Sequence, residues 1–493
     1  MKNIPQVKLG IISVSRNCFP ITLSEKRRHA VVEACTKAGL DIYDCPVTVE
    51  NEIDAVKSVE DVVSKGINSL VVFLGNFGPE TPETLIAKMF NGPVMYVAAA
   101  EDSGDSLING RGDAYCGMLN CSYNLGLRNI KAFIPEYPVG DPSDIAKMIG
   151  EFIPVARTLI GVSNLKIITY GPRPEDFLAC NAPIKQLYNL GVEIQENSEL
   201  DLLVAFNKHK DDKRIPEVVA DMERELGGGN KMPGILPRLA QYELTLLDII
   251  EEAKGARKYV ALANKCWPAF QTEFGFVPCY VNSRLVAKGI PVSCEVDIYG
   301  TLSEYIGLCA TEAPVTLLDI NNSVPKDMHK AEIAGKFDYR LGETFMGFHC
   351  GNTPICYLRN PEMKYQLIMK RALEPDSEPD ITRGTLEGDI KAGQITFYRL
   401  QGTAEGGIKA YIAQGEILPV ETRSFGGIGI FAIKEMERFY RHVLIADRYP
   451  HHGAVAFGHV GKILFDVLSM LGVPTVSYNQ PKSLPYPTEN PFC

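Results

Sequence analysis

Acidic residues and histidines gather in two segments of this sequence that lie far apart in the chain. The first segment, 266–307, carries Glu273 and Asp297 close to short apolar runs. The second, RYPHHGAVAFGHVG, holds three of the eight histidines of the chain within nine positions. Two carboxylates and one imidazole form a ligand set that suits Mn²⁺ or Mg²⁺ better than a thiolate-bound zinc.

The two acids follow runs that read as β-strands. In VSCEVD the alternation of a strand places Ser293, Glu295 and Asp297 on one face. Ligand sites in open α/β sheets lie at the carboxyl ends of strands, which makes Glu273 and Asp297 candidate metal ligands and catalytic groups. The structural alternative stays open, with Glu273 a solvated loop acid and Asp297 a cap for a helix near Thr301.

The histidines differ in what their positions allow. His451 and His452 are adjacent, so their side chains point in different directions and at most one of them is a natural metal ligand. His459 lies between glycines at a helix start, where packing or capping is an alternative role. His349 and Asn352, in MGFHCGNTP, are candidates to contact substrate hydroxyls, and local backbone bonding is the alternative.

A divalent cation held in this way suits the isomerisation of a sugar. It holds two adjacent sugar oxygens, lowers the pKa of the carbon-bound proton between them and stabilises the enediolate that forms. The residues alone leave two other interpretations open. A metal-dependent aldolase also passes through an enediolate, and tandem α/β lobes also build non-catalytic sugar-binding or regulatory proteins.

The elements that must position these residues fall into three stretches. The length of 493 residues predicts roughly three domains of about 150 residues each. In 1–165 and again in 166–312, β-branched runs alternate with helical patterns, which predicts two Rossmann-like three-layer α/β domains with parallel sheets. In 313–493, alternating strands and turn residues predict an antiparallel β-barrel-type domain that ends in two helices.

Composition and charge exclude several classes of protein. The net charge of −10 argues against a broad nucleic-acid-binding face. We find no apolar stretch of about 18 residues, so we expect no membrane contact. The thirteen cysteines show no CxxC pairs, and the first residues do not read as a signal peptide. We therefore expect a cytoplasmic protein with reduced thiols.

Four segments in order, KCWP, TEFG, CEVDIYGTLS and HHGAVAFGHVG, resemble the active-site segments of the L-fucose isomerase family, with L-arabinose isomerase a more distant match. The separation of twenty-four positions between Glu273 and Asp297 also resembles the fucose isomerase pattern. The resemblance implies a metal-dependent aldose–ketose isomerase. In it Glu273, Asp297 and His452 hold one Mn²⁺, or another divalent metal such as Mg²⁺, and Glu273 also acts as acid and base.

The resemblance implies further properties of the molecule. It favours a homo-oligomer, with a hexamer as the expected form, in which the first domain of a neighbouring subunit completes each site. The substrate is then a five- or six-carbon sugar, namely L-fucose, L-arabinose or an anionic hexose such as sulfoquinovose. Trp267 is a candidate wall for the sugar and His451 a candidate contact. Arg16 and, secondarily, Arg423 are candidates to bind an anionic group, although exposed arginines usually pair with water or acids.

Overall fold

The computed structural model describes residues 3–376 and 380–492. These residues divide into two compact units. One comprises Pro5–Ile160 together with Ser469–Leu471, and the other holds the rest of the described chain. None of the helices among these residues is long and apolar enough to cross a membrane.

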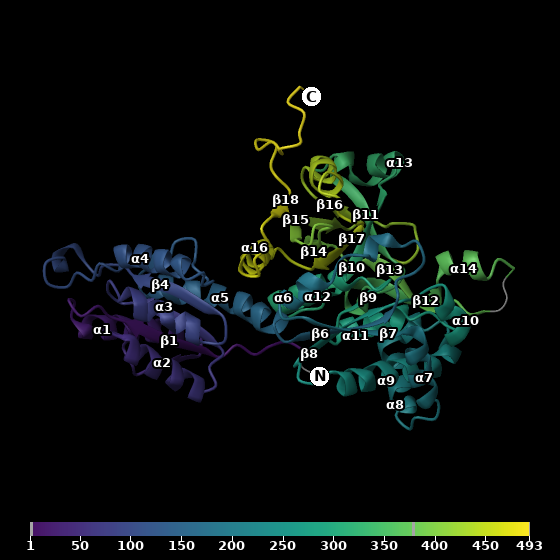
Figure 1. Cartoon of the computed structure of the whole chain (residues 1–493). Coiled ribbons are helices and arrows are strands. Elements are labelled where there is room, and N and C mark those ends of the chain that lie inside the picture. The colour runs from purple at the N-terminus through teal and green to yellow at the C-terminus, as the bar shows by residue number, and fades with distance from the viewer. Residues whose placement is uncertain (1–2, 377–379, 493) are drawn as a thin grey trace. The chain divides into compact units, whose positions relative to one another are not determined.

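The first unit contains a parallel sheet in the order β2-β1-β3-β4-β5 (Figure 1). Its strands are β1 (Leu9–Val14), β2 (Ile42–Asp44), β3 (Ser69–Leu74), β4 (Val94–Ala99) and β5 (Val139–Gly140). Its helices are α1 (Ile21–Lys37), α2 (Glu52–Ser64), α3 (Glu80–Met89), α4 (Ala114–Leu127) and α5 (Pro142–Val162). Every residue of β1, β3 and β4 is buried, as a parallel sheet covered on both faces requires. The predicted parallel α/β arrangement is confirmed here.

The second unit begins with another parallel sheet, in the order β7-β6-β8-β9. Its strands are β6 (Leu165–Gly171), β7 (Glu193–Ser198), β8 (Tyr259–Asn264) and β9 (Val292–Cys294). Its helices are α6 (Lys185–Asn189), α7 (Glu199–Lys208), α8 (Ile215–Leu226), α9 (Leu236–Ala253), α10 (Ala269–Phe274), α11 (Cys279–Ala287) and α12 (Ile298–Thr311). Strand β9 runs directly into α12, so the residues between them lie at the carboxyl edge of this sheet.

The remaining strands form one large mixed sheet in the order β12-β13-β16-β11-β10-β17-β14-β15-β18. They are β10 (Thr316–Ser323), β11 (Thr344–His349), β12 (Leu358–Tyr365), β13 (Arg383–Ile390), β14 (Gly393–Gly402), β15 (Ile408–Leu418), β16 (Gly427–Ala432), β17 (His452–Ala456) and β18 (Val476–Tyr478). Strands β13 and β16 pair in parallel, as do β15 and β18, and β12 and β18 are edges. The predicted antiparallel β-barrel-type domain is thus corrected to a mixed sheet, although β15 also pairs with β16.

Two features of this sheet matter for the site. Strand β10 lies between β11 and β17, and its register places Asp319 directly across from His452.

The helices of this part are α13 (Lys326–Met328), α14 (Leu367–Leu373), α15 (Met436–Phe439) and α16 (Gly461–Met470). Helix α15 continues as a π-helical turn over Tyr440–Ile445, so both predicted terminal helices are present.

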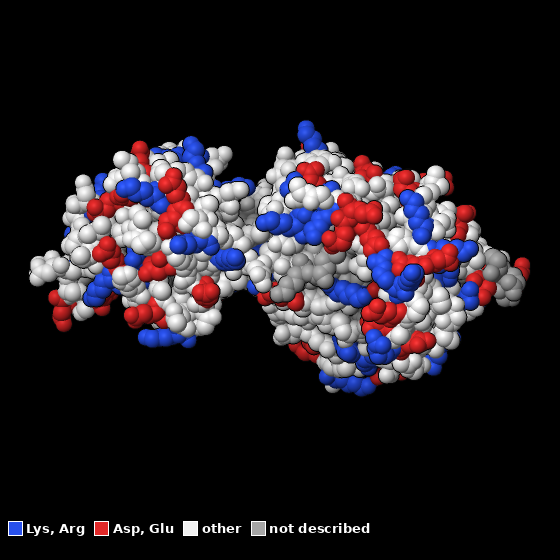
Figure 2. All heavy atoms as spheres, turned by 90° about the horizontal axis from the view of Figure 1, so that it is seen from below, with Lys and Arg blue, Asp and Glu red and all other residues white. Residues whose placement is uncertain are grey.

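The sheets of the second unit share one hydrophobic core, because Leu262 of β8, Leu318 of β10 and Phe397 of β14 belong to the same buried cluster. The division into domains 1–165, 166–312 and 313–493 stays a prediction. On the face shown in Figure 2, lysine and arginine side chains are interspersed with acidic ones among the described residues.

Candidate active site

The turn between β9 and α12 positions the first acidic group of the site. Glu295 and Val296 both adopt left-handed backbone conformations, with φ of 55° and 56°. This region is rare for non-glycine residues and unusual for a β-branched one, and backbone strain of this kind gathers at functional sites. The turn breaks the alternation of the strand, and it brings Glu295 Oε2 to 3.4 Å from His452 Nε2.

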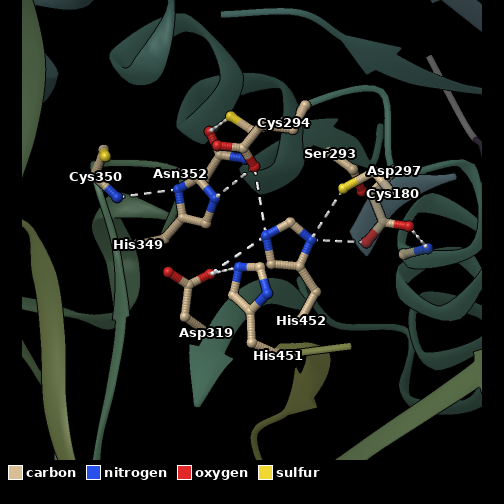
Figure 3. A network of polar contacts seen from close by, with 12 residues as sticks. Cys180, Ser293, Cys294, Asp297, Asp319, His349, Cys350, Asn352, His451 and His452 are labelled. Atoms are coloured by element: carbon tan, nitrogen blue, oxygen red, sulfur yellow. Dashed lines mark hydrogen bonds and ion pairs between the residues drawn. The ribbon is translucent and has the colours of Figure 1, made fainter. Parts of the chain in front are cut away.

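Three atoms from three elements converge at this point. Asp319 Oδ1, from β10, lies 3.3 Å from the same His452 Nε2 that Glu295 approaches (Figure 3). Glu295 Oε2 and Asp319 Oδ1 are buried atoms that meet no partner in hydrogen-bonding geometry among the described residues. Buried carboxylate oxygens without partners are costly unless a cation compensates them. Ligand-type atoms close enough to hold one metal ion form two groups here, Glu295 with His349 and His452, and Asp319 with His451 and His452. The carboxylates in both groups suit a divalent cation that prefers oxygen ligands.

Asp297 is held differently from the other two acids. Its oxygens accept hydrogen bonds from Arg399 Nη1 and Nη2 at 2.8 and 2.9 Å, and from the backbone N–H of Gly300 at 2.8 Å. The remaining contact is to His452 Nδ1, at 2.8 Å, on the opposite side of the ring from Nε2. The expected role of Asp297 as a metal ligand stays a prediction, since Cys180, Asp297 and His452 form a group that could hold a metal ion. The alternative of a helix cap is confirmed, since Asp297 caps α12.

The electrostatics of these acids follow from their partners. Burial alone would raise the pKa of Asp297, but the charge of Arg399 and the hydrogen bond with His452 hold it well below its ordinary value. Burial would likewise raise the pKa of Glu295, and the imidazoles of His349 and His452 lower it instead. Burial would lower the pKa of His452, whereas its contacts with Asp297, Cys180 and Glu295 raise it. The cluster therefore favours charged carboxylates.

The other two histidines near these carboxylates are His349 and His451. His349 Nδ1 accepts a hydrogen bond from the backbone N–H of Cys350 at 3.0 Å, so in the neutral ring the proton sits on Nε2. That nitrogen lies 3.9 Å from Glu295 Oε2, and Glu295, His349 and His452 together form a group that could hold a metal ion. His451 Nε2 lies 3.7 Å from Asp319 Oδ1. Burial, followed by the charge of His452, lowers the pKa of His451.

Aromatic rings form one wall of the cluster. Phe177, in the segment after β6, makes edge-to-face contacts with Trp267 and His451, at centroid distances of 6.0 and 5.5 Å. Trp267 Nε1 donates to Glu295 Oε1 at 3.3 Å. Trp267 therefore lies beside Glu295, and its role as a wall for the sugar stays a prediction. The sequence analysis did not single out Phe177.

The segment that carries Phe177 also contributes Cys180, whose Sγ lies 3.6 Å from His452 Nδ1. Cys180 and Val296 line a hollow of about 650 Å³ at the carboxyl ends of β6 and β7, with Arg173 and Asn181 also in its wall. Ligand pockets for small molecules typically measure about 300–1,000 Å³. The hollow therefore has room for a sugar.

Glu273 is not brought to this cluster. It lies exposed on α10 and lines a separate hollow of about 230 Å³ with Glu199, Leu203 and Phe270. This placement agrees with the alternative of a solvated acid, and the role of Glu273 as a ligand and base stays a prediction. Glu295, which the sequence analysis placed on the same face as Asp297, lies in the cluster with His452. One signal pointed to it, because Glu295 and Asp319 are also separated by twenty-four positions.

The remaining predicted contacts lie in other surroundings. Asn352 is buried, and its side chain accepts from Cys294 Sγ at 3.5 Å and donates to the backbone oxygen of Val292 at 2.9 Å. His459 Nε2 contacts the backbone oxygen of Gly415 at 3.0 Å.

Both arginines proposed for an anionic group contact acids. Arg16 Nη1 lies 3.7 Å from Glu80 Oε1, and its guanidinium stacks over Phe77 at 4.8 Å from the ring centroid. Arg423 Nη2 pairs with Glu332 at 2.9 Å. Roles for these arginines in substrate binding stay predictions.

Two family models match parts of this chain. A family model described as the N-terminal domain of fucose/sulfoquinovose isomerase matches residues 10–163, and one described as the C-terminal domain of L-fucose isomerase matches residues 347–479. Together these two matches span more than half of the chain.

Relatives of this chain from several bacteria are named sulfoquinovose isomerase. The one from Priestia aryabhattai is 26% identical over 482 residues, which cover 95% of this chain and 98% of that protein. The one from Alkalicoccus urumqiensis is 25% identical over 348 residues, 68% of this chain and 70% of that protein. The one from Clostridium sp. (strain MSTE9) is 28% identical over 222 residues, 44% of each chain.

Proposed function

Since this chain belongs to the fucose isomerase family and is an aldose–ketose sugar isomerase, we propose that its substrate is sulfoquinovose or a hexose with a similar anionic group. The name of the relatives supports this choice, because one of them matches nearly the whole chain. L-fucose and L-arabinose are the neutral alternatives. The relatives reported above are named isomerases, which favours isomerisation over an aldolase or a sugar receptor.

We further propose that Glu295, Asp319 and His452 bind a divalent cation, with Mn²⁺ the expected metal and Mg²⁺ the alternative. The observation that carries this proposal is that Glu295 Oε2 and Asp319 Oδ1 lie 3.4 and 3.3 Å from His452 Nε2. Both are buried oxygens that meet no partner in hydrogen-bonding geometry among the described residues. When bound, such a cation supplies Lewis-acid polarisation of the sugar oxygens.

Residues of the chain then carry out proton transfer and orient the reacting groups. One of the two carboxylates, through Glu295 Oε2 or Asp319 Oδ1, accepts a carbon-bound proton of the open-chain sugar and returns it at the neighbouring carbon, while the other keeps its oxygen on the cation. Trp267 donates to the other oxygen of Glu295 and so fixes the carboxylate in this orientation. His349 presents its Nε2–H to the same site and is placed to donate to a substrate oxygen. The wall formed by Phe177 and Trp267 excludes water.

The substrate and metal are tested together. The protein is treated with a chelator, and ketose formation is then measured with sulfoquinovose, L-fucose and L-arabinose, each with and without added Mn²⁺. We expect turnover of sulfoquinovose only with the metal restored, and weaker turnover of the neutral sugars. Full activity after chelation would contradict the metal site, and a preference for a neutral sugar would contradict the anionic substrate.

The catalytic carboxylate is tested with two matched substitutions. Glu295→Gln removes the proposed proton acceptor, and a positioned base contributes about 10²–10⁴-fold in rate, so kcat should fall by at least about 10²-fold. Glu273→Gln changes an exposed acid away from the cluster and should leave kcat close to wild type. The reverse result, with loss only in Glu273→Gln, would restore the expectation from the sequence resemblance and overturn this assignment.

A further inference from the structure

Arg399 is a fully buried arginine beside the site. It lies on β14, and its guanidinium grips Asp297 with two parallel hydrogen bonds of 2.8 and 2.9 Å. Its Nε donates to Gln401 at 2.7 Å, and Nη1 also approaches the backbone oxygen of His452 at 3.3 Å. A bidentate arginine–carboxylate pair fixes geometry as well as charge. Arg399 therefore holds Asp297 in one orientation.

Asp297 in turn fixes the ring of His452. Asp297 Oδ2 lies 2.8 Å from His452 Nδ1, so a neutral His452 keeps its proton on Nδ1 and donates it to the carboxylate. The lone pair is then on Nε2, which faces Glu295 Oε2 and Asp319 Oδ1. Figure 3 shows the imidazole between Asp297 on one side and Asp319 on the other.

His349 differs from His452 in which ring nitrogen carries the proton. His349 Nδ1 accepts from a backbone N–H, so its Nε2 carries the proton and points toward Glu295. The two imidazoles near Glu295 thus present opposite functions, a lone pair from His452 and a hydrogen from His349. The partner of Nδ1 differs between the two rings, a carboxylate for His452 and a backbone amide for His349.

The same guanidinium decides which face of His452 is available to a cation. Cys180, Asp297 and His452 also bring ligand-type atoms close together on the Nδ1 side of the ring. Arg399 already places a positive charge against both oxygens of Asp297 there. A second cation on that side would be repelled and would find no free carboxylate oxygen. The Nε2 side is left as the binding face.

We propose that Arg399 is a positioning residue that acts through Asp297 to hold the Nε2 lone pair of His452 toward Glu295 and Asp319, and so sets the affinity for the divalent cation. This inference rests on the proposed function. Carboxylates that orient a ligating histidine in this way typically contribute about 10–100-fold to metal affinity.

The test measures the dissociation constant for Mn²⁺ from the paramagnetic resonance signal of the free ion, together with the melting temperature. Asp297→Asn keeps the shape of the side chain and an oxygen for Gly300, but its amide would donate to Nδ1 and leave the proton on Nε2. We expect Mn²⁺ to bind about 10–100-fold more weakly to this variant. Arg399→Lys keeps the positive charge but cannot form both parallel hydrogen bonds to Asp297. We expect a smaller loss of affinity for Mn²⁺ in this variant.

Tyr398→Phe is the matched control. Tyr398 neighbours Arg399 on β14, is equally buried and donates to the backbone oxygen of Ser303 at 2.8 Å. A merely structural role for Arg399 would lower the melting temperature in Arg399→Lys and Tyr398→Phe alike and leave the dissociation constant unchanged. If folded Asp297→Asn bound Mn²⁺ within twofold of wild type, the inference alone would be overturned. A wild-type protein that bound no divalent cation would overturn the proposed function as well.

Discussion

The charge state of a buried carboxyl group in this protein depends on the groups that surround it, as two glutamates show. Glu295 lies beside two imidazoles, which lower its pKa. Glu83, on α3 of the first unit, is completely buried, and burial raises its pKa to about 8 from the ordinary value of 4.5. The first is therefore charged and the second neutral in the folded protein at neutral pH. Position in the sequence gives no indication of this difference.

Glu83 gives a pH-dependent prediction. Between pH 4.5 and about 8 the unfolded chain has released a proton that folded Glu83 keeps, so the free energy of unfolding falls as pH rises through this window. Glu83→Gln removes this dependence and should stabilise the protein by about 1–3 kcal/mol at pH 8, with little change at pH 5. Urea unfolding at both pH values measures the effect.

The control for this prediction is Glu60→Gln, which changes an exposed glutamate on α2. It should leave the free energy of unfolding unchanged at both pH values. Equal effects of Glu83→Gln at pH 5 and pH 8 would show that Glu83 does not titrate in this window.

At the scale of elements, the strands were predictable and their partners were not. The apolar composition of runs such as Leu9–Val14 and Ser69–Leu74 is enough to predict buried parallel strands. Pairing in the last sheet depends on contacts far apart in the chain, such as β13 with β16 in parallel, and alternation along one strand cannot specify them. The position of Glu295 was missed for a related reason, because its left-handed turn interrupts the alternation that the sequence displays.

One glycine marks where the last sheet bends back on itself. Strand β15 pairs with β16 in addition to β14, and a Cβ added at Gly415 would lie 2.2 Å from the backbone oxygen of Ala432 in β16. Gly415→Ala should therefore force these strands apart and lower the free energy of unfolding by about 1–3 kcal/mol. Chemical denaturation of the variant measures this loss.

Gly104→Ala serves as the comparison, because a Cβ at Gly104 meets no described atom within 4 Å. It should change stability by less than about 0.5 kcal/mol, as expected for a surface substitution. If Gly415→Ala proved as mild as Gly104→Ala, the close approach of β15 and β16 would not be needed for folding.

At the scale of the whole molecule, the family and the parallel α/β sheets predicted from the sequence are confirmed, whereas the roles of the site residues stay predictions. Of the expected metal ligands, His452 lies in the cluster, Asp297 stands behind it and Glu273 lies elsewhere. The ordered motifs located the right segments, but the same separation of twenty-four positions fits two pairs of acids, and only the folded chain distinguishes them. The homo-oligomeric state, the hexamer and the cytoplasmic location stay predictions.

The pairing of β10 with β17 has a consequence for how the chain reaches its active form. Asp319 faces His452 only in the native alignment of these two strands. A slip of a single position would turn Asp319 to the opposite side of the sheet. Under the proposed function, only molecules in which these two strands have paired in the native register would then bring Asp319 to the cation during refolding.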